Sequence, residues 1–441
     1  MKNFINGKGF TIDPNKAHYD VRRTPVYPLF YGIHYLAFGE DGSYKYIRVT
    51  QILLFILATF ALLQAAFHFT QKKSIAIIAA CLFGFNPLFV VYLFYTITEG
   101  ISPALMCFML YFISLGYRYN RKKDWFFAGL FFALGCLCRP AIFFLAPSFL
   151  FLIIYKNKKK VNDIIIYSLF SFFGAAVLFA PHVIRNYCVS KDFILLEKYY
   201  GDPMDYGMPN IALRYWITCW INPADYTSEA ISNKMLQNIN NSTSSIPKSV
   251  LIEQELERLP KQAFLANSRD EIKDAYGSLY DYYNIKLSGI STKKSIDSSE
   301  AIAQQKMEHL RNKFIQNKPF QFYIIRPMLF LKSLILQSNS YILIFLDDYQ
   351  NNIVKWIAKL VLYLLNIYLF AALFLALIFI KKYKPVTIFA FLFLFLHLIY
   401  LIFIIEYFEA RYLIPIFPLM YIVAGIFTVE CLGKIKAKLN F

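Results

Sequence analysis

Glu99 is the residue of this sequence with the clearest potential for chemistry. It lies in the short polar stretch Phe94–Gly100, between two hydrophobic runs, and it is the only acidic residue between Asp41 and Asp124. An acidic side chain at the centre of a membrane helix costs about 2.5–3.5 kcal/mol on insertion scales, so its presence there indicates a functional site. A polar turn at the membrane surface is the alternative, because a carboxylate costs little there. A carboxylate can accept a proton from a hydroxyl or hold a divalent ion.

Short motifs that contain arginine form a second group of candidates. They are Arg22-Arg23-Thr24-Pro25-Val26-Tyr27-Pro28, Arg139-Pro140, Pro181-His182-Val183-Ile184-Arg185-Asn186 and Arg411-Tyr412-Leu413-Ile414-Pro415. A guanidinium binds phosphate oxygens through paired hydrogen bonds, and preorganised cations stabilise the negative charge that develops on a departing phosphate. These motifs therefore suit a reaction with a phosphate leaving group.

Each arginine also has a purely structural explanation. Arg22 and Arg23 could be ordinary interfacial residues whose stems lie along apolar surface while their charged ends reach water. Arg139 could cap a broken helix. Arg185 and Arg411 could pair with acidic residues of the outer loops. The histidines are expected to be packed or interfacial rather than catalytic, His182 and His397 among them.

The composition identifies the class of protein that carries these residues. The chain has 441 residues, of which 58% are hydrophobic and 17% charged, and its mean hydropathy is +0.44. Soluble domains carry about 25% charged residues, so the sequence indicates a polytopic membrane protein. The formal charge of +18 comes largely from short clusters between apolar runs. Because no basic stripe with interleaved aromatics is present, nucleic acid is excluded as a partner, and membrane lipids are expected instead.

Nine apolar runs predict an all-α polytopic fold with about nine transmembrane or re-entrant helices. They lie near 47–69, 75–95, 99–116, 125–138, 141–155, 164–181, 354–380, 386–404 and 412–432. The runs 125–138 and 141–155 are short for full spans and are separated by Arg139-Pro140, which indicates a broken pair or a re-entrant element. The polar region 182–352, which precedes the last three runs, is predicted to be mixed helix and loop. Within it, Ile272, Tyr276, Leu279, Tyr280 and Tyr283 share one face of a helix.

The basic clusters predict the orientation. They are Lys72-Lys73, Arg118 to Lys123, Lys156 to Lys160, Lys381 to Lys384 and Lys434 to Lys438. If each run crosses once, all five clusters fall on one side, which the positive-inside rule identifies as the cytoplasm. The expected organisation is then an extracytoplasmic loop or juxtamembrane segment over 1–46, transmembrane helices over 47–181, an extracytoplasmic region over 182–352, and C-terminal transmembrane helices with a cytoplasmic tail over 353–441. Nothing in the sequence carries 1–46 across, so a further helix upstream of Met1 is expected.

The cysteines add one expectation. Cys188 and Cys219 both lie in the long polar region and could form a disulfide if that region is extracytoplasmic. Cys136 and Cys138 lie inside a hydrophobic run without a second pair of metal ligands nearby, which argues against a metal site.

Taken in chain order, the motifs resemble those of the GT-C membrane glycosyltransferases. The resemblance is closest to the protein O-mannosyltransferases, the lipid A aminoarabinose transferases and their bacterial relatives. It comprises a basic-Pro-x-Tyr-Pro element, a Thr-Glu turn, a helix ending in Arg-Pro, a Pro-x-x-x-Arg-Asn sequence and an Arg-Tyr-x-x-Pro sequence before the last helix. It covers about 1–190 and 354–432.

The resemblance implies transfer of a hexosyl or pentosyl group from a polyprenyl-phosphate donor to a lipid, glycan or protein acceptor. The reaction would take place on the extracytoplasmic face of a bacterial plasma (inner) membrane. Glu99 is the implied catalytic residue. Substrate binding is implied for Arg22, Arg23, Tyr27, Arg139, Arg185, Arg411 and Tyr412. No cofactor is certain, although a divalent cation could assist the carboxylate through ligands that the sequence leaves unknown.

Three other functions stay open at this point. A flippase for lipid-linked glycans would need internal pseudo-symmetry and polar residues at mid-membrane depth, and the sequence shows neither. An O-antigen polymerase or ligase would carry its essential arginines within the large outer loop. A catalytically incomplete fragment is the third alternative, because the first carboxylate of the GT-C site is expected upstream of Met1.

Overall fold

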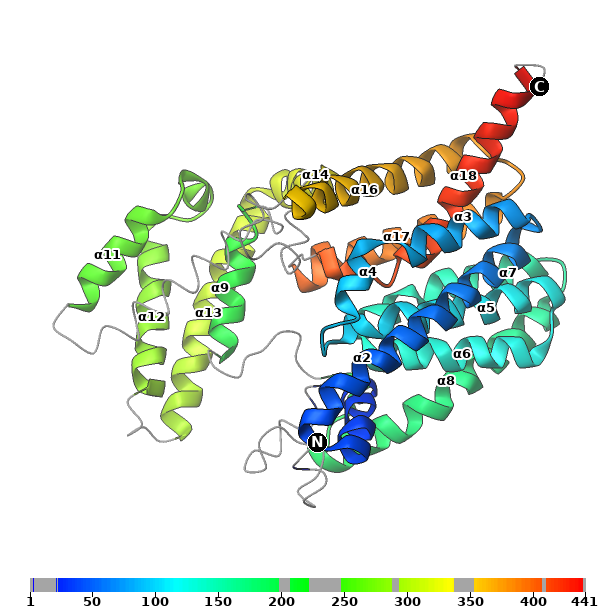
Figure 1. The fold of residues 1–441 in the computed structure, drawn as a ribbon. Coiled ribbons are helices and arrows are strands. Elements are labelled where there is room, and N and C mark those ends of the chain that lie inside the picture. The colour runs from blue at the N-terminus through cyan, green and yellow to red at the C-terminus, as the bar shows by residue number, and fades with distance from the viewer. Residues whose placement is uncertain are drawn as a thin grey trace. The chain divides into compact units, whose positions relative to one another are not determined.

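A computed structural model describes residues 3, 21, 23–197, 207–221, 247–287, 293–336, 353–406 and 410–438. These residues form helices and turns and contain no strand, so the all-α class is confirmed (Figure 1). The chain divides into two compact units. The first unit comprises Met1–Lys198, Ile335–Tyr400 and Glu409–Phe441, and the second unit comprises Tyr199–Leu334 and Leu401–Phe408.

The first unit contains most of the apolar helices. They are α2 (Val26–Thr70), α3 (Lys73–Gly84), α4 (Pro87–Tyr92), α5 (Ser102–Tyr119), α6 (Lys122–Cys138), α7 (Ala146–Asn157), α8 (Val161–Ser190), α16 (Ile353–Phe379), α17 (Lys384–Tyr400) and α18 (Phe417–Lys438). Three short 3-10 turns join them: η2 (Thr98–Gly100), η3 (Pro140–Leu145) and η9 (Ala410–Leu413). Within the described part of the chain, six segments are long and apolar enough to cross a membrane, which supports a polytopic membrane protein.

Several helix boundaries differ from those expected. The run 75–95 is two helices, α3 and α4, because Asn86 caps α4 by accepting a hydrogen bond from the Leu88 amide at 2.9 Å and Pro87 occupies the first turn. The first apolar helix begins at Val26 rather than near 47, with a kink at Gly39, whose φ of 70° suits glycine. The expected boundary at 181 falls inside α8, which continues past its internal proline to Ser190.

The predicted break between α6 and the next run is confirmed. α6 ends at Cys138, Arg139 is extended with φ −141° and ψ 109°, and Pro140 opens η3. Proline disfavours helical geometry in the residue before it, so the sequence Arg139-Pro140 stops the helix where the hydrophobic run would have continued. This break leaves the Arg139 side chain at a helix end.

Helices α6 and α8 lie with their backbones in close approach. A Cβ atom on Gly129 would lie 1.9 Å from the Ser171 carbonyl oxygen, and one on Gly174 would lie 1.9 Å from the Phe126 carbonyl oxygen. Only glycine fits at these two positions, as is common where membrane helices cross closely. The crossing fixes α6, and with it Arg139.

The helix ends with basic clusters contact one another within the first unit. The Lys72 ammonium lies 2.6 Å from Glu430 of α18, and the Asn120 amide donates to Asn157 at 2.9 Å, which joins the end of α5 to the end of α7. Glu99, Arg139 and Arg411 lie at the other ends of their helices, away from the basic clusters. Glu99 precedes α5, Arg139 follows α6 and Arg411 precedes α18. This agrees with the predicted alternation of the loops, while the assignment of the basic end to the cytoplasm stays a prediction.

The second unit is a helical domain with its own core. Its elements are α9 (Gly207–Ile217), α11 (Lys248–Arg258), η4 (Lys261–Phe264), α12 (Arg269–Leu287), α13 (Lys293–Asn317), the π-helical turn η5 (Gln321–Ile325), most of α14 (Arg326–Leu336) and the π-helical turn η8 (Leu401–Ile405). The predicted apolar face of α12 is confirmed, because all five of its residues are buried in this core.

Cys188 and Cys219, which could pair if their region is extracytoplasmic, are both free in this structure. Cys219 is buried in the core of the second unit, where its thiol lies 3.3 Å from the Tyr215 carbonyl oxygen. Burial in an apolar core, rather than a covalent partner, therefore accounts for this cysteine.

Candidate active site

Glu99 lies in the turn η2, between α4 and α5, and Gln51 of α2 holds that turn in place. The buried Gln51 amide nitrogen donates to the Leu93 and Tyr95 carbonyl oxygens at 2.7 and 3.2 Å, and its oxygen accepts from the Tyr27 hydroxyl at 3.3 Å. A Cβ atom on Gly100 would lie 2.2 Å from the Gln51 side-chain oxygen. The backbone beside Glu99 can therefore approach α2 only because residue 100 is glycine.

Two arginines from distant parts of the chain bind one oxygen of the Glu99 carboxylate. The Arg139 guanidinium lies 2.8 Å from Oε1 of Glu99, and Nε of Arg411 lies 3.7 Å from the same oxygen. The other oxygen, Oε2, accepts a hydrogen bond from the Thr98 hydroxyl at 3.0 Å. The Cys138 thiol lies 3.9 Å from the Thr98 carbonyl oxygen, so the end of α6 contacts the same turn.

Arg139 also contacts the turn η9, which carries Arg411 and Tyr412. Its Nη1 donates to the Arg411 carbonyl oxygen at 3.4 Å, and its guanidinium lies 5.4 Å from the centre of the Tyr412 ring. The buried His397 of α17 donates through Nε2 to the Tyr412 carbonyl oxygen at 2.7 Å. Contacts from α6 and α17 therefore fix the backbone on which Arg411 stands.

The electrostatics of this group favour an ionised carboxylate. Burial by itself raises the pKa of Glu99, but the positive charges of Arg139 and Arg411, with the Thr98 hydroxyl, outweigh it and lower the pKa below its ordinary value. The Glu99 side chain is 4% exposed, that of Arg139 8% and that of Arg411 28%. Arg411 is thus the member of the group with the most access to a ligand.

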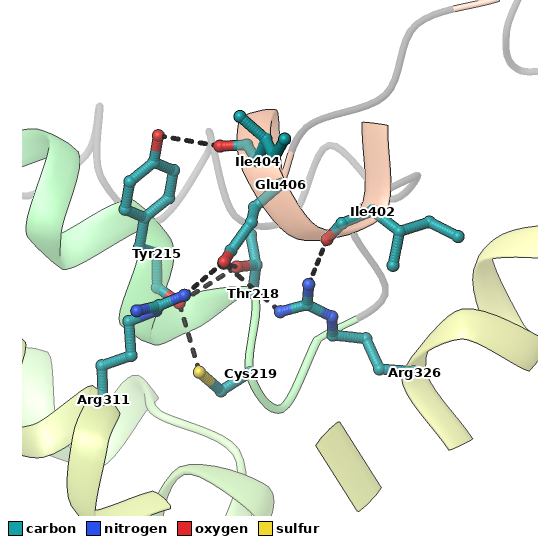
Figure 2. A network of polar contacts seen from close by, with 8 residues as sticks. All are labelled: Tyr215, Thr218, Cys219, Arg311, Arg326, Ile402, Ile404 and Glu406. Atoms are coloured by element: carbon teal, nitrogen blue, oxygen red, sulfur yellow. Dashed lines mark hydrogen bonds and ion pairs between the residues drawn. The ribbon is translucent and has the colours of Figure 1, made fainter. Parts of the chain in front are cut away.

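The structure brings together four of the predicted site residues, namely Glu99, Arg139, Arg411 and Tyr412. Tyr27 belongs to the same neighbourhood, because it packs in one apolar cluster with Ile101 and Cys138, which adjoin Glu99 and Arg139 in sequence. Glu406, an acid that the sequence offered to Arg411, binds two other arginines, Arg311 and Arg326, within the second unit (Figure 2).

The remaining predicted residues lie in other surroundings. Arg22 lies outside the described residues. Arg23 is exposed, and its charge opposes the effect of burial on Glu197, a carboxyl whose pKa burial raises to about 7. Arg185 donates to Asn186 at 2.9 Å, beside bonds from His182 and Asn186 to the loop that follows α8. These contacts place Arg23 and Arg185 near the end of α8.

Sequence reasoning missed the two residues that hold the site from behind. Gln51 and His397 are polar residues at the edge of or inside apolar runs, and both make hydrogen bonds to the backbone of segments that carry site residues. The prediction that His397 is packed agrees with its complete burial. A polar side chain in or beside an apolar run was the signal that could have pointed to these two residues. The spacing of residues in the sequence could not show which backbone groups they bind.

The donor set around Glu99 does not suit a divalent cation. In the described part of the chain, no three His, Cys, Asp or Glu side chains converge on one point. The single carboxylate at the site is already neutralised by two guanidinium groups, which would repel a second positive centre. No step of the chemistry below is therefore assigned to a metal.

Comparison with known proteins gives a match to a family model. Residues 22–184 match the family model described as dolichyl-phosphate-mannose-protein mannosyltransferase, a stretch that contains Glu99 and Arg139 but ends before Arg411. No curated protein and no solved structure matches the chain. The matched family is of the GT-C type, as the order of the sequence motifs predicted. This match, which covers less than half of the chain, together with the apolar helices supports a membrane glycosyltransferase of the GT-C type.

Proposed function

We propose that the protein moves a sugar from a polyprenyl-phosphate donor to a lipid, glycan or protein acceptor on the extracytoplasmic face of a bacterial inner membrane. The observation that carries the proposal is the buried Glu99 carboxylate held by Arg139 and Arg411, at the helix ends opposite the basic clusters. A carboxylate and arginines together supply what the reaction needs, namely an acceptor for a hydroxyl proton and donors for a phosphate.

Arg411 is assigned to the donor phosphate. Its side chain is the most exposed of the three, and Glu99 holds it only loosely at 3.7 Å, so its guanidinium can share a phosphate without leaving the carboxylate. Charge-assisted contacts to phosphate are among the stronger hydrogen bonds. They also strengthen as the carrier phosphate takes up negative charge in the transition state, because the cation is already in place.

Arg139 is assigned to holding Glu99 rather than to the donor. Its side chain is nearly buried, it lies 2.8 Å from the carboxylate, and its remaining contacts go to the Arg411 carbonyl oxygen and the Tyr412 ring. Because Arg139 is enclosed in this way, it orients Glu99 and the turn that carries Arg411. The pair of arginines thereby keeps Glu99 ionised in a buried position where an isolated carboxylate would take up a proton.

Glu99 is assigned to the acceptor hydroxyl. Both arginines approach Oε1, whereas Oε2 accepts one hydrogen bond from Thr98. A carboxylate oxygen has two lone pairs, so Oε2 keeps one that can accept a hydrogen bond from an incoming hydroxyl. In the transfer step, that hydroxyl oxygen forms the new bond to the sugar carbon, the bond from sugar to phosphate breaks, and Glu99 takes the hydroxyl proton.

Two variants separate these roles in a transfer assay with a labelled polyprenyl-phosphate sugar. Arg411→Ala should raise the KM for the donor, because a phosphate contact is lost. Glu99→Gln keeps the size of the side chain but removes its charge, so kcat should fall by about 10²–10⁴-fold with donor binding nearly intact. Glu430→Gln, which removes an ion pair at the opposite helix ends, is the matched control and should resemble the wild type. Wild-type turnover in Glu99→Gln would show that the carboxylate is only a turn residue.

A further inference from the structure

Three helix ends meet around the ring of Tyr119, at the basic end of the first unit. His68, in the last turn of α2, lies with its ring 5.7 Å from that of Tyr119, centre to centre. The Arg118 guanidinium, near the end of α5, lies 5.1 Å from the centre of the same ring, and that of Arg121, just before α6, lies 5.0 Å from it. One exposed ring is thus bordered by two positive charges.

The two guanidinium groups differ in their partners. Arg121 binds the buried Asp124 carboxylate through Nε at 2.7 Å and through Nη2 at 3.3 Å, so its charge is balanced. Among the residues that the structure describes, no carboxylate lies within ion-pair distance of Arg118. Because like charges this close repel each other, an anion beside Arg118 would stabilise the whole group.

Two buried nitrogen atoms of this group make no hydrogen bond within the described part of the chain. They are Nη1 of Arg118 and Nδ1 of His68. The Arg118 guanidinium lies 6.0 Å from the Phe67 ring as well as 5.1 Å from that of Tyr119, and such rings attract the cation without supplying an oxygen acceptor. A donor that leaves water without an acceptor is costly. The group therefore has the donors that a phosphate, with its several oxygen atoms, would use.

An aromatic strip leads from these donors toward the middle of α5 and α6. Tyr111 precedes Arg118 by two turns on the same face of α5, a distance of about 10 Å along the axis. Its ring lies 5.2 Å from that of Phe112. Phe112 in turn stacks on Phe127 and Phe131 of α6 at 5.2 and 5.4 Å, and Phe127 is 39% exposed. Since the adjoining α2 is long and apolar enough to cross a membrane, its end lies at the membrane surface and the strip lies at the level of the acyl chains.

We propose that this group binds an anionic phospholipid. Arg118 binds the headgroup phosphate, His68 adds a hydrogen bond through Nδ1, and an acyl chain lies along the aromatic strip. An anionic headgroup suits the site because the exposed Lys122 and Lys123 add positive charge beside it, and basic pockets between membrane helices bind such headgroups. A lipid is chosen over free phosphate because the strip fits a ligand with an apolar chain. The site lies at the helix ends away from Glu99 and does not depend on the proposed transfer reaction.

A lipid titration of the full-length protein tests the site without a transfer assay. The protein is held in micelles of an uncharged detergent, and its thermal unfolding midpoint is followed as phosphatidylglycerol is added. A ligand that binds only the folded protein raises this midpoint with its concentration, which gives an apparent Kd. Phosphatidylglycerol should raise the midpoint, and phosphatidylcholine should bind more weakly because the positive charge of its choline is repelled. Diacylglycerol, which lacks the phosphate, and inorganic phosphate, which lacks the chain, should leave the midpoint unchanged.

Variants then locate the bound lipid. Arg118→Gln should raise the apparent Kd for phosphatidylglycerol roughly 10-fold, because a charge-assisted hydrogen bond to the phosphate is lost. Arg118→Lys keeps the charge but loses the planar guanidinium, so its Kd should lie between those of the wild type and Arg118→Gln. His68→Phe keeps a ring beside Tyr119 but lacks Nδ1, and should raise the Kd by a smaller factor. The matched control Lys381→Gln removes one exposed positive charge between α16 and α17 and should change the Kd by less than about 2-fold, because salt screens such a charge.

Several results would overturn the site. An unchanged midpoint with phosphatidylglycerol, or a wild-type Kd in Arg118→Gln, would show that Arg118 binds no such lipid. An equal loss of affinity in Lys381→Gln would indicate diffuse attraction between the basic surface and anionic lipid rather than a site. An equal rise of the midpoint with inorganic phosphate would refute the lipid as the ligand, and an equal rise with diacylglycerol would refute the role of the phosphate. If Arg118→Gln does not fold, a wild-type Kd in both Arg118→Lys and His68→Phe overturns the proposal.

Discussion

Replacing Arg139 by methionine tests the electrostatic reasoning about Glu99 most directly. At an effective dielectric constant of about 20, unit charges 2.8 Å apart attract by about 6 kcal/mol and unit charges 3.7 Å apart by about 4.5 kcal/mol, so Arg139 supplies the larger share of the attraction. Removing one partner of a buried pair costs about 3–5 kcal/mol. Because Arg411 stays as a second partner, we expect a loss near the low end, about 3 kcal/mol.

That loss should appear as a shift in the pH dependence of transfer. Because the charge of Arg139 favours the ionised carboxylate, its loss should raise the pKa of Glu99. In the wild type the arginines lower this pKa, so Glu99 is ionised and activity should persist until the pH falls below the ordinary range of a carboxyl. In Arg139→Met the effect of burial is opposed less, so Glu99 should take up a proton and activity should disappear at a higher pH than in the wild type.

The assay is the rate of transfer at saturating donor between pH 4.5 and 8, with Arg121→Met as control. Arg121 stands at the other end of α6 and pairs with Asp124 at 2.7 Å, so its removal also deletes an arginine ion pair but leaves Glu99 alone. If Arg139→Met folds normally and keeps its activity down to pH 4.5, as the wild type should, the claim that Arg139 keeps Glu99 ionised is refuted.

Two further predictions concern stability. Gly100→Ala places a Cβ atom 2.2 Å from the bound Gln51 side chain, so it should destabilise the fold by about 1–3 kcal/mol in thermal unfolding. The control Gly433→Ala, whose added Cβ atom would have nothing within 4 Å, should not destabilise it. Equal stability of the two variants would contradict the packing described at η2. Burial raises the folded-state pKa of Glu197 from 4.5 to about 7, so the folded state binds more protons than the unfolded state in that window, and stability should fall as the pH rises from 4.5 to 7. Glu197→Gln should remove this dependence, and a variant that keeps it would show that another group titrates.

Local properties of the sequence were sufficient for the helical class and for the residues that could carry chemistry. A lone carboxylate between two apolar runs indicated Glu99 because a charge is costly at that depth. The pair Arg139-Pro140 predicted the end of α6, because proline excludes helical geometry in the residue before it. The period of α12 gave its buried face without any knowledge of its neighbours. Each of these inferences depends on forces that act within a few residues of the chain.

The same reasoning predicted the ends of helices less accurately. The hydropathy of 75–95 is continuous, yet Asn86 and Pro87 divide it into α3 and α4. The polar residues before 47 suggested a loop, yet they continue the helix that begins at Val26. Hydropathy reports the cost of burial rather than the backbone angles, so it locates apolar segments better than it locates their ends.

The tertiary structure alone decided which charges meet. Sequence order offered Glu99 several arginines, and Arg411 an acid in the loop before it, but packing joined Glu99 to Arg139 and Arg411 and gave Glu406 to Arg311 and Arg326. Packing likewise brought Gln51 and His397 to the backbone of the site. A buried charge needs an opposite charge beside it, because leaving it unpaired is costly. Which opposite charge is close enough depends on how the helices pack, and the spacing of residues in the sequence does not specify this.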